Sequence, residues 1–411
     1  MKSIFRLSIL TTALFASHAM AAGYQLAEQS ATGLGRAFAG EAAIADNASV
    51  LGRNVAAITR FEHTALSVGA VYIKPDVNIK GTTVVGGHTL NADARDIADD
   101  AWVPNLYLVT PINDRLSMGF GATSYYGLGV EMPSNYNAGH FGNVSDIKTY
   151  DLGLALAYQL TPWLSAGMGI SAIRGEGEVG GTYPSGNLIA KHLEGDGWAM
   201  GWNTGILISP SEKTRIGISY RNGVDLKLKG DAKLGQKIGS TYVGLEDTGE
   251  LILPLPATAE LALYHQLTPS FAMHASINWT DWSKFTQLEA KLDRYNTMHI
   301  KDENWEDNWR YAIGMTYQLT PLWQLRSGIA YDRSPVSAEH RTISIPDADR
   351  IWYSAGVGYQ VTPQLNLDLG LTFIDGKKVP VHENLSTLSS TFDGTSEGDA
   401  WLAGLQASYT F

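Results

Sequence analysis

The chain contains no cysteine among its 411 residues. It therefore cannot carry a disulfide framework, a thiolate zinc site, an iron–sulfur cluster or a cysteine nucleophile. Basic residues are also scarce, because 30 Lys and Arg stand against 41 Asp and Glu, which gives a formal net charge of -11. A nucleic-acid-binding protein needs a basic surface, so this class of protein is excluded as well.

Charged residues make up only 17% of the chain, below the roughly 25% of a soluble domain. Beyond the N-terminus, no run of about 18 apolar residues exists, so the sequence predicts no transmembrane helix. In contrast, the 43 Gly, 19 Tyr and 11 Trp are high counts. This composition is unusual both for a soluble enzyme and for a helical membrane protein.

The N-terminus has the features of a secretory signal peptide. Lys2 and Arg6 precede a short apolar stretch at residues 7–15, and a small-residue segment ends in Ala19-Met20-Ala21. The apolar stretch is too short to span a bilayer, so we predict a signal peptide at residues 1–21 that is cleaved during export. The exported chain is then either soluble or crosses a membrane as a closed barrel.

Large apolar residues alternate with small or polar residues in residues 150–160, 311–319 and 365–373. A period of two predicts strands with one apolar and one polar face. Such strands also occur in soluble β-sandwiches. Small residues, Gln and Asp on the second face suit a wet lumen, and Leu with Tyr on the first face suits lipid.

A recurring turn motif gives the number of strands. Four close copies and two looser ones are Thr161-Pro162, Thr268-Pro269, Thr320-Pro321, Thr362-Pro363, Thr110-Pro111 and Ser209-Pro210. Proline cannot donate to a strand ladder, so each copy ends a strand and predicts a hairpin. Six hairpins give twelve strands, and a strand near Phe61 and the C-terminal strand make fourteen. Longer polar loops are expected on the opposite side, at residues 75–100, 129–145 and 377–397.

We therefore predict an all-β protein, a 14-stranded antiparallel transmembrane β-barrel over residues 61–411, in a Gram-negative outer membrane. The chain ends on an aromatic residue, Phe411, after an alternating strand. This ending resembles the signal that the barrel-assembly machinery recognises, so this machinery and outer-membrane lipid are expected partners. Residues 22–60 are rich in Ala and Gly and are too short for a core of their own. We expect them to fill the lumen as a hatch, and the alternative is a disordered periplasmic tail.

Several segments carry a resemblance to one family. Residues 22–26, 30–40, 45–48 and 343–352 resemble the FadL family of outer-membrane transporters for long-chain fatty acids and other hydrophobic molecules. The resemblance implies a monomer in which extracellular loops capture a hydrophobic ligand and pass it to a pocket above the hatch. A kink in the third strand, after Pro111, is then expected to open the barrel wall so that the ligand leaves sideways into the membrane.

The resemblance also implies ligand-binding or gating positions: Tyr24, Leu26, Asn54, Val55, Ala56, Ser124, Tyr126 and Gly127. A glycine inside a strand has a physical reason at a kink, although Gly127 could also simply end a strand. Two features depart from the family. Val55 replaces the proline of the family's Asn-Pro-Ala sequence, and the third loop, near residues 180–197, looks short.

A third departure concerns the charge of the pocket. Two basic pocket positions of the family fall on Gly181 and Glu306, so the cations that would hold a carboxylate look lost. Arg174 or Arg310 could replace them.

We expect passive uptake of hydrophobic molecules, with long-chain fatty acids first and neutral or aromatic hydrocarbons as the alternative. No enzyme activity, cofactor, metal or nucleic acid is expected. Two further alternatives are a general aqueous porin and an outer-membrane hydrolase. The G-x-S-x-G sequence at residues 394–398, with Ser396, precedes a strand rather than the helix of a nucleophile elbow, which argues against the hydrolase. The acidic residues Asp302, Glu303, Glu306 and Asp307 fit a solvated loop better than a cation site.

Overall fold

The computed structural model describes residues 23–184, 188–238, 241–386 and 389–411. The predicted signal peptide, residues 1–21, lies outside the described residues. The strand segments are β1 (Ala65–Val85), β2 (His88–Asn91), β3 (Ala101–Pro111), β4 (Leu116–Thr123), β5 (Gly127–Glu131), β6 (Val144–Thr161), β7 (Leu164–Thr182), β8 (Leu188–Ser211), β9 (Thr214–Arg221), β10 (Val224–Ile238), β11 (Thr241–Leu255), β12 (Thr258–Thr268), β13 (Phe271–Thr280), β14 (Gln287–Leu292), β15 (Met298–Asp302), β16 (Asn308–Gln318), β17 (Trp323–Asp332), β18 (Arg350–Gln360), β19 (Leu365–Gly376), β20 (Val379–Leu385) and β21 (Ser390–Thr410).

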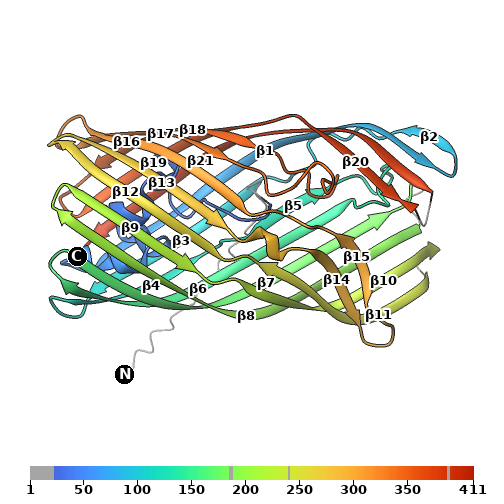
Figure 1. Ribbon diagram of the computed structural model, residues 1–411, viewed down its shortest axis with the longest axis horizontal. Helices are drawn as coiled ribbons and strands as arrows, with labels where there is room; N and C mark the ends of the chain where they lie inside the picture. The colour runs from blue at the N-terminus through green and yellow to red at the C-terminus, as the bar shows by residue number, and fades with distance from the viewer. Residues whose placement is uncertain (1–22, 185–187, 239–240, 387–388) are drawn as a thin grey trace, which may run out of the picture.

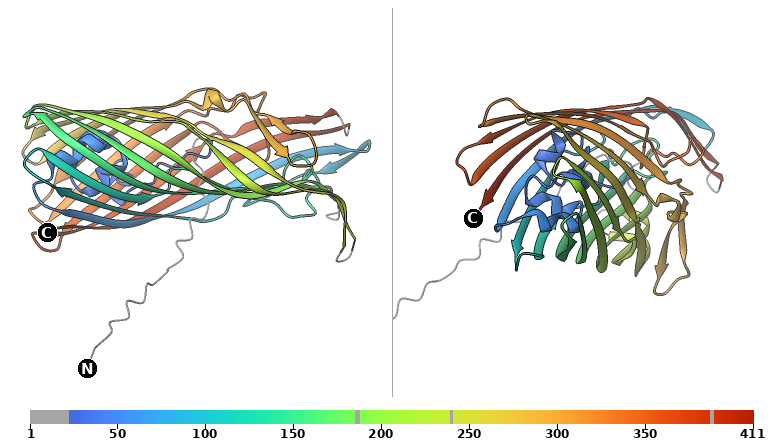
Figure 2. Two further views of the ribbon diagram at one scale, coloured as in Figure 1. Left: turned by 90° about the horizontal axis from the view of Figure 1, so that it is seen from below. Right: turned by 60° about the vertical axis from the view of Figure 1, so that its left-hand side comes forward.

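These segments form one closed antiparallel barrel of fourteen strands, as the sequence predicts (Figures 1 and 2). Seven of the fourteen strands are each interrupted once, so that β4 and β5, for example, belong to the same strand. The barrel closes where β1 pairs with β21, with Ala65 opposite Thr410. Closure removes the free sheet edges that hydrocarbon could not solvate. No helix in the described part of the chain is long and apolar enough to cross a membrane.

All six predicted hairpins are present at the turn motifs. They join β3 to β4, β6 to β7, β8 to β9, β12 to β13, β16 to β17 and β18 to β19. On the opposite side, all three expected loops are wrong in part. Residues 129–145 begin and end in strand, because β5 runs to Glu131 and β6 begins at Val144. Strand β1 continues to Val85 and pairs with β21 as far as Val84 opposite Thr391, and β20 pairs with β21 as well. Residues 75–85 and 379–385 are therefore strand, because their neighbours supply partners beyond the span that lipid covers.

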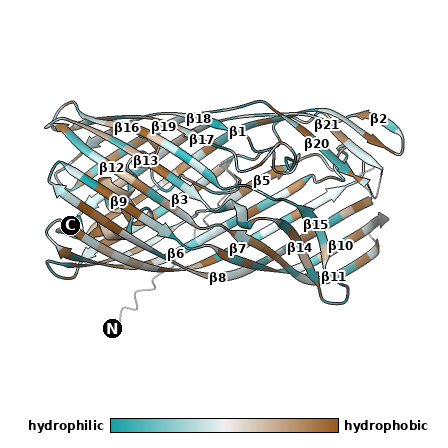
Figure 3. Cartoon of the chain, in the orientation of Figure 1, coloured by the Kyte–Doolittle hydropathy of each residue, from teal (hydrophilic) through white to brown (hydrophobic). Residues whose placement is uncertain are grey.

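The predicted alternation sets the two faces of the wall. On β6, Leu154 is 54% exposed, whereas the next residue, Ala155, is 6% exposed and faces the lumen. Hydrophobic and hydrophilic residues alternate along the strands in Figure 3. An apolar outer face and a small or polar inner face are what a membrane barrel requires.

Four short helices lie inside the barrel: α1 (Ala31–Leu34), α2 (Glu41–Ile44), η1 (Ala48–Gly52) and η2 (Val55–Arg60). We call residues 23–60 the hatch. Figures 1 and 2 show its helices in the half of the barrel nearer the C-terminus. Three helices begin at residues whose side chains cap them, Ser30, Asn47 and Asn54. Helices this short are unstable alone in water, so their order depends on burial against the wall.

Glycines on the inner face let the hatch backbone lie directly on the wall. A Cβ atom at Gly328 would lie 2.1 Å from the Arg36 carbonyl oxygen. At Gly217 it would lie 2.0 Å from the Ala42 carbonyl oxygen. Non-bonded heavy atoms do not approach so closely, so only glycine fits at these positions. The high glycine count therefore has a structural use at the hatch–wall contact.

The first prediction tests this contact. Gly328→Ala should force the wall and hatch apart, cost roughly 1–3 kcal/mol of stability through overpacking, and raise ion conductance through the lumen. Conductance in planar bilayers and the denaturant midpoint in lipid vesicles would be measured. Gly153→Ala is the matched control, because the nearest heavy atom to its added Cβ is 3.8 Å away. Equal behaviour of the two variants would contradict a tight hatch–wall contact.

Candidate functional site

The third strand of the barrel is broken between β4 and β5. Strand β3 pairs with β4 as far as Leu106 opposite Ala122. Beyond this point, the described residues of the two strands are joined by one side-chain hydrogen bond, from the Thr123 hydroxyl to the Pro104 carbonyl at 3.4 Å, and by one backbone bridge between Ala98 and Val130. Residues 101–105 of β3 pair only with β1 there. The barrel wall therefore has an interrupted ladder where the resemblance places a kink.

The first residues of the hatch occupy this break. The Leu26 amide donates to the Tyr125 carbonyl at 2.8 Å, and the Gly127 amide donates to the Tyr24 carbonyl at 2.8 Å. The two segments thus pair as a short antiparallel ladder, centred on the bridge between Gln25 and Tyr126. This pairing satisfies backbone groups that the missing β3 contact would leave free.

The structure brings five of the eight expected site residues together at this break: Tyr24, Leu26, Ser124, Tyr126 and Gly127. The Ser124 hydroxyl donates to the Thr149 carbonyl at 2.6 Å. This hydrogen bond holds the interrupted part of the third strand to β6. A Cβ atom at Gly127 would lie 3.3 Å from the Leu26 side chain. Space beside the hatch is therefore tight at Gly127.

The other three expected residues lie at the far end of the hatch. Asn54 caps η2 and donates to the carbonyls of Ala42 at 2.7 Å and Ile206 at 3.0 Å. Val55 takes the first helical position, where proline is favoured because its missing N–H is not needed. The asparagine cap remains, so the helix start survives without the proline. The backbone of Val55 and Ala56 packs on Gly167 of β7.

An apolar pocket lies above the hatch. Its walls include Leu128, Ile147, Leu228, Leu253, Phe285 and Ile300. Tyr24 closes it from below and is fully buried. The Tyr24 ring packs edge-on against Trp282 and Phe285, with centroids 4.6 and 5.9 Å away, and its hydroxyl donates to the Pro254 carbonyl. The same residue therefore forms the pocket floor and bonds to the broken strand.

Two lysines line this pocket, Lys191 of β8 and Lys301 of β15. The Lys301 Nζ atom is buried and has no hydrogen-bond partner among the described residues. Its paired carboxylate oxygen, on Glu383, is 3.9 Å away. A buried ammonium group without hydrogen bonds is costly, so this atom favours an anionic partner.

These lysines correct the inference that the pocket has lost its cations. Gly181 of β7 lies opposite Lys191 of β8 in the strand ladder. The basic residue is therefore on the neighbouring strand rather than at position 181. Glu306 is 59% exposed and pairs with Arg333 at 3.1 Å. The segment at residues 180–197 is mostly β7 and β8, with residues 185–187 outside the described part.

The two arginines suggested as replacements for the lost cations make other interactions. Arg174 pairs with Asp196 at 2.6 Å, and Arg310 donates to the Ala37 carbonyl of the hatch at 2.8 Å. Sequence reasoning missed Lys191 and Lys301 because it compared single positions. Only the strand register shows that a side chain on the adjacent strand reaches the same place.

The pocket also contains the carboxyl groups of Asp146 and Glu303, so its residue charges balance. Glu303 accepts a hydrogen bond from the Trp305 ring nitrogen at 2.9 Å. Burial raises the pKa of Glu303, against the lowering effect of Lys301. Burial thus weakens the anionic form of Glu303, which would compete with a ligand carboxylate.

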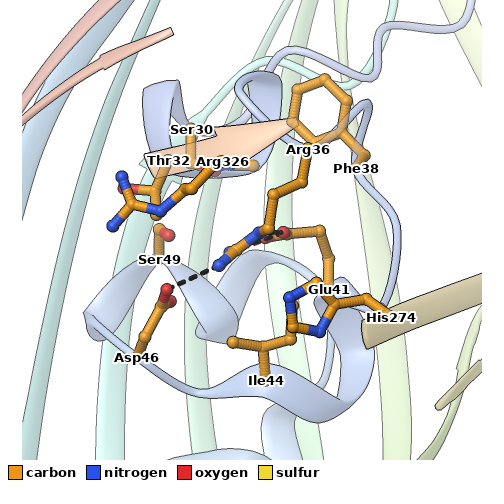
Figure 4. A network of polar contacts seen from close by, with 12 residues as sticks. Ser30, Thr32, Arg36, Phe38, Glu41, Ile44, Asp46, Ser49, His274 and Arg326 are labelled. Carbon is orange, nitrogen blue, oxygen red and sulfur yellow. Dashed lines mark hydrogen bonds and ion pairs between the residues drawn. The ribbon is translucent and has the colours of Figure 1, made fainter. Parts of the chain in front are cut away.

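Buried ion pairs fix the core of the hatch. Arg36 bonds Glu41 at 2.8 Å and Asp46 at 2.7 Å (Figure 4). Burial alone would raise the pKa of Asp46, but the Arg36 guanidinium outweighs it and lowers this pKa to about 2. Thr32 donates to Asp368 of β19 at 3.0 Å, and this carboxylate also bonds Arg326 at 2.6 Å. The hatch core is therefore tied to the wall.

Glu28 lies between this core and the strand break. Its Oε2 atom accepts from the Ala27 amide at 2.7 Å, and its Oε1 atom is buried without a hydrogen-bond partner among the described residues. Burial raises the pKa of Glu28 to about 7, against the lowering effects of this amide and of Arg53. Glu28 is thus a buried carboxyl group that changes charge near neutral pH.

The second prediction follows from this pKa. A carboxyl group whose pKa is higher in the folded state than its unfolded value of about 4.3 stabilises that state fully below about 4.3. This stabilisation is lost as pH rises through about 7. We expect amide hydrogen exchange at residues 23–29, corrected for intrinsic rates, to become faster above neutral pH. Glu28→Gln should remove this dependence, and Glu62→Gln, an exposed control, should keep it. The same pH response in both variants would rule out Glu28 as its cause.

Comparisons with known proteins agree with this architecture. A family model described as "Outer membrane protein transport protein (OMPP1/FadL/TodX)" matches residues 12–411. The "Long-chain fatty acid transport protein" of Escherichia coli (strain K12) is 38% identical, over 100% of this chain and 99% of that protein. The "Outer membrane protein P1" of Haemophilus influenzae is 35% identical, over 99% of each.

Two solved structures support the fold. A Pseudomonas aeruginosa FadL homologue superposes with a TM-score of 0.86 and 24% identity, covering 95% of this chain and 100% of the other. The Pseudomonas putida toluene transporter TodX gives a TM-score of 0.70 and 17% identity, with coverage of 95% and 100%. At these identities, the likeness bears on the architecture alone.

Proposed function

Because the chain belongs to the OMPP1/FadL/TodX family of outer-membrane transport proteins, we propose that it takes up long-chain fatty acids by passive diffusion. It is an outer-membrane transport channel and not an enzyme. In keeping with this, Ser396 lies within β21 and is 2% exposed, so it could not act as a nucleophile. The hatch inside the lumen also argues against an open aqueous porin.

The buried Lys301 Nζ atom, which has no hydrogen-bond partner among the described residues, is the observation that favours a fatty acid over a neutral hydrocarbon. A carboxylate between Lys301 and Lys191 would supply the charge-assisted hydrogen bonds that the buried Nζ atom lacks. The acyl chain would lie against the apolar side chains above Tyr24. A neutral hydrocarbon would fill the same apolar space but leave the cation unsatisfied. The similarity to proteins named for fatty-acid transport supports the same choice.

The third prediction tests the head group. Lys301→Met should weaken the binding of oleate to purified protein about tenfold or more, because a hydrogen bond to a charged group contributes roughly 1.5–3 kcal/mol. The binding of methyl oleate should change little. Lys191→Met should act in the same direction, and Lys284→Met, an exposed lysine outside the pocket, should have no effect. If acid and ester bind the wild-type protein equally well, the carboxylate site is wrong.

We also propose the route by which the ligand leaves. Tyr24 closes the pocket floor, and residues 24–26 cover the break in the third strand, so one movement of this segment would open both. The outward path would then pass Ser124, Tyr126 and Gly127 into the bilayer. The remaining interactions are proposed as well: capture at the extracellular end, contact with outer-membrane lipid, assembly through Phe411, and a monomeric state.

The fourth prediction locks this segment. The chain has no cysteine, so Gln25→Cys with Tyr126→Cys introduces a single possible disulfide between residues that face each other in an antiparallel bridge. Oleate uptake by cells should stop under oxidising conditions and return after reduction.

The control joins the far end of the hatch to the wall. Thr59→Cys with Ser165→Cys replaces two hydroxyl groups that lie 2.8 Å apart. This cross-link should leave uptake unchanged, because the hatch core need not move. Full uptake by the oxidised double variant at Gln25 and Tyr126 would exclude the proposed exit.

A further inference from the structure

A second cavity lies next to the strand break, and its lining is polar. The hatch contributes Gln29 and Arg53, and the wall contributes Asn203, Arg221, Glu260 and Asn278. We call this cavity the polar chamber. Tyr126 lines the polar chamber, whereas Tyr24 lines the apolar pocket, and their ring centroids are 6.3 Å apart. The two tyrosines therefore separate an apolar space from a polar one.

The opposite wall is shaped to hold this partition. Between β11 and β12 the strand is interrupted after Leu255. The Tyr126 hydroxyl donates to the Pro256 carbonyl at 2.6 Å, and the Tyr24 hydroxyl donates to the Pro254 carbonyl. The neighbouring strand, which consists of β9 and β10, is also interrupted, directly after Arg221. Carbonyl groups of this irregular backbone thus accept the hydrogen bonds from the two tyrosine hydroxyls.

Several polar atoms in the chamber have no partner. The side-chain oxygens of Gln29, Asn203 and Asn278 are buried without a hydrogen bond in the described part of the chain. Gln29 itself is 2% exposed. These oxygens are hydrogen-bond acceptors, so they call for a donor such as water, and it is the arginines of the chamber that could bind an anionic group.

The two arginines of the chamber make only long ion pairs, and Arg53 also donates to the Ala27 carbonyl. Arg221 lies 3.6 Å from Asp151, and Arg53 lies 3.9 Å from Glu260, measured between nitrogen and oxygen. Charge-assisted hydrogen bonds between such groups are about 2.7–2.9 Å long. A guanidinium group carries five N–H donors, so Arg221 can bind a further acceptor while it stays beside Asp151.

Arg221 also contacts the strand break itself. Its guanidinium stacks over the ring of Tyr125, 3.7 Å from the centroid. The carbonyl of Tyr125 is the group that accepts the Leu26 amide. A group held by Arg221 would therefore be next to the place where the hatch segment would open the wall.

We propose that the polar chamber is a second carboxylate site, in which Arg221, with Arg53 nearby, holds the head group of a fatty acid during exit. This inference rests on the proposed function and adds a step to it. The acyl chain enters the bilayer first through the strand break, while the carboxylate stays in the chamber among polar groups. A carboxylate forced into hydrocarbon without such partners would incur a large desolvation cost.

The chamber would thus act on exit rather than on capture, and only for ligands with an anionic head group. A methyl ester offers Arg221 only a neutral carbonyl oxygen, and a neutral hydrocarbon offers no acceptor, so neither forms a charge-assisted hydrogen bond. The apolar pocket with Lys301 would set affinity, and Arg221 would set the rate at which a bound acid leaves. These two roles can be measured separately.

The experiment compares Arg221→Met with wild type for oleate and methyl oleate. We expect oleate uptake by cells to slow about tenfold, with ester uptake and the equilibrium affinity of purified protein for oleate both unchanged. Arg221→Lys should recover much of the rate because it restores the charge. Arg174→Met is the matched control, because this arginine lies outside both cavities.

Two results would overturn the proposal. Equal slowing of acid and ester would show that Arg221 only supports the wall, and an unchanged oleate rate would show that the chamber has no part in exit. If Arg221→Met fails to assemble, Asn203→Leu removes polarity at the residue that faces Arg221 across the β8–β9 ladder, and the same outcomes apply. Failure of the proposed function itself would be distinct, because wild type would then not prefer acid over ester in binding.

Discussion

The structure depends on one constraint: the backbone of the hatch must lie directly against the inner face of the barrel. A fourteen-stranded barrel encloses more space than its own side chains fill, so a separate segment has to occupy the lumen. Short helices cannot stay ordered alone, and they become stable here because the wall touches them on several sides. Inward glycines such as Gly328 and Gly217 permit that approach. A filled lumen, a closed pocket floor and an interrupted wall strand all follow from this contact.

The same contact divides the hatch into two parts of different stability. The core, around Arg36, is held by buried ion pairs, by helix caps and by hydrogen bonds to several strands. Residues 24–26 are held by two backbone hydrogen bonds to the broken strand, by the Tyr24 hydroxyl, and by hydrogen bonds from Thr280 to Gln25 and from Gln29 to Leu26. Segments that move for function generally come from the low-stability end of a protein. Residues 24–26 carry no charged side chain, so the part of the hatch that borders the strand break has no ion pair to lose.

Much of the fold was predictable because it repeats. Each Thr-Pro motif ends a strand for the same local reason, and alternation sets the faces without knowledge of the neighbours. The charges of the pocket were not predictable in this way. Lys191 reaches the place expected for a residue at Gly181 because the two face each other across a ladder, and register is a property of strand pairs. The polar chamber was missed for a related reason, since Gln29, Arg53 and Arg221 come from distant segments that meet only through the hatch–wall contact.

The position of polar groups gives a physical reason why the proposed sideways exit would suit an amphipathic ligand. A straight path towards the hairpin side would carry an acyl chain past Arg53, Arg221 and Glu260, where it would strip water from charged groups without replacing their hydrogen bonds. A path through the broken strand leads instead to the lipid that faces the apolar outer wall. The head group has the opposite preference, because the chamber offers donors that lipid lacks. Since Tyr24 and Tyr126 stand at the boundary between these two environments, the proposed exit would draw chain and head group apart at the same point in the barrel.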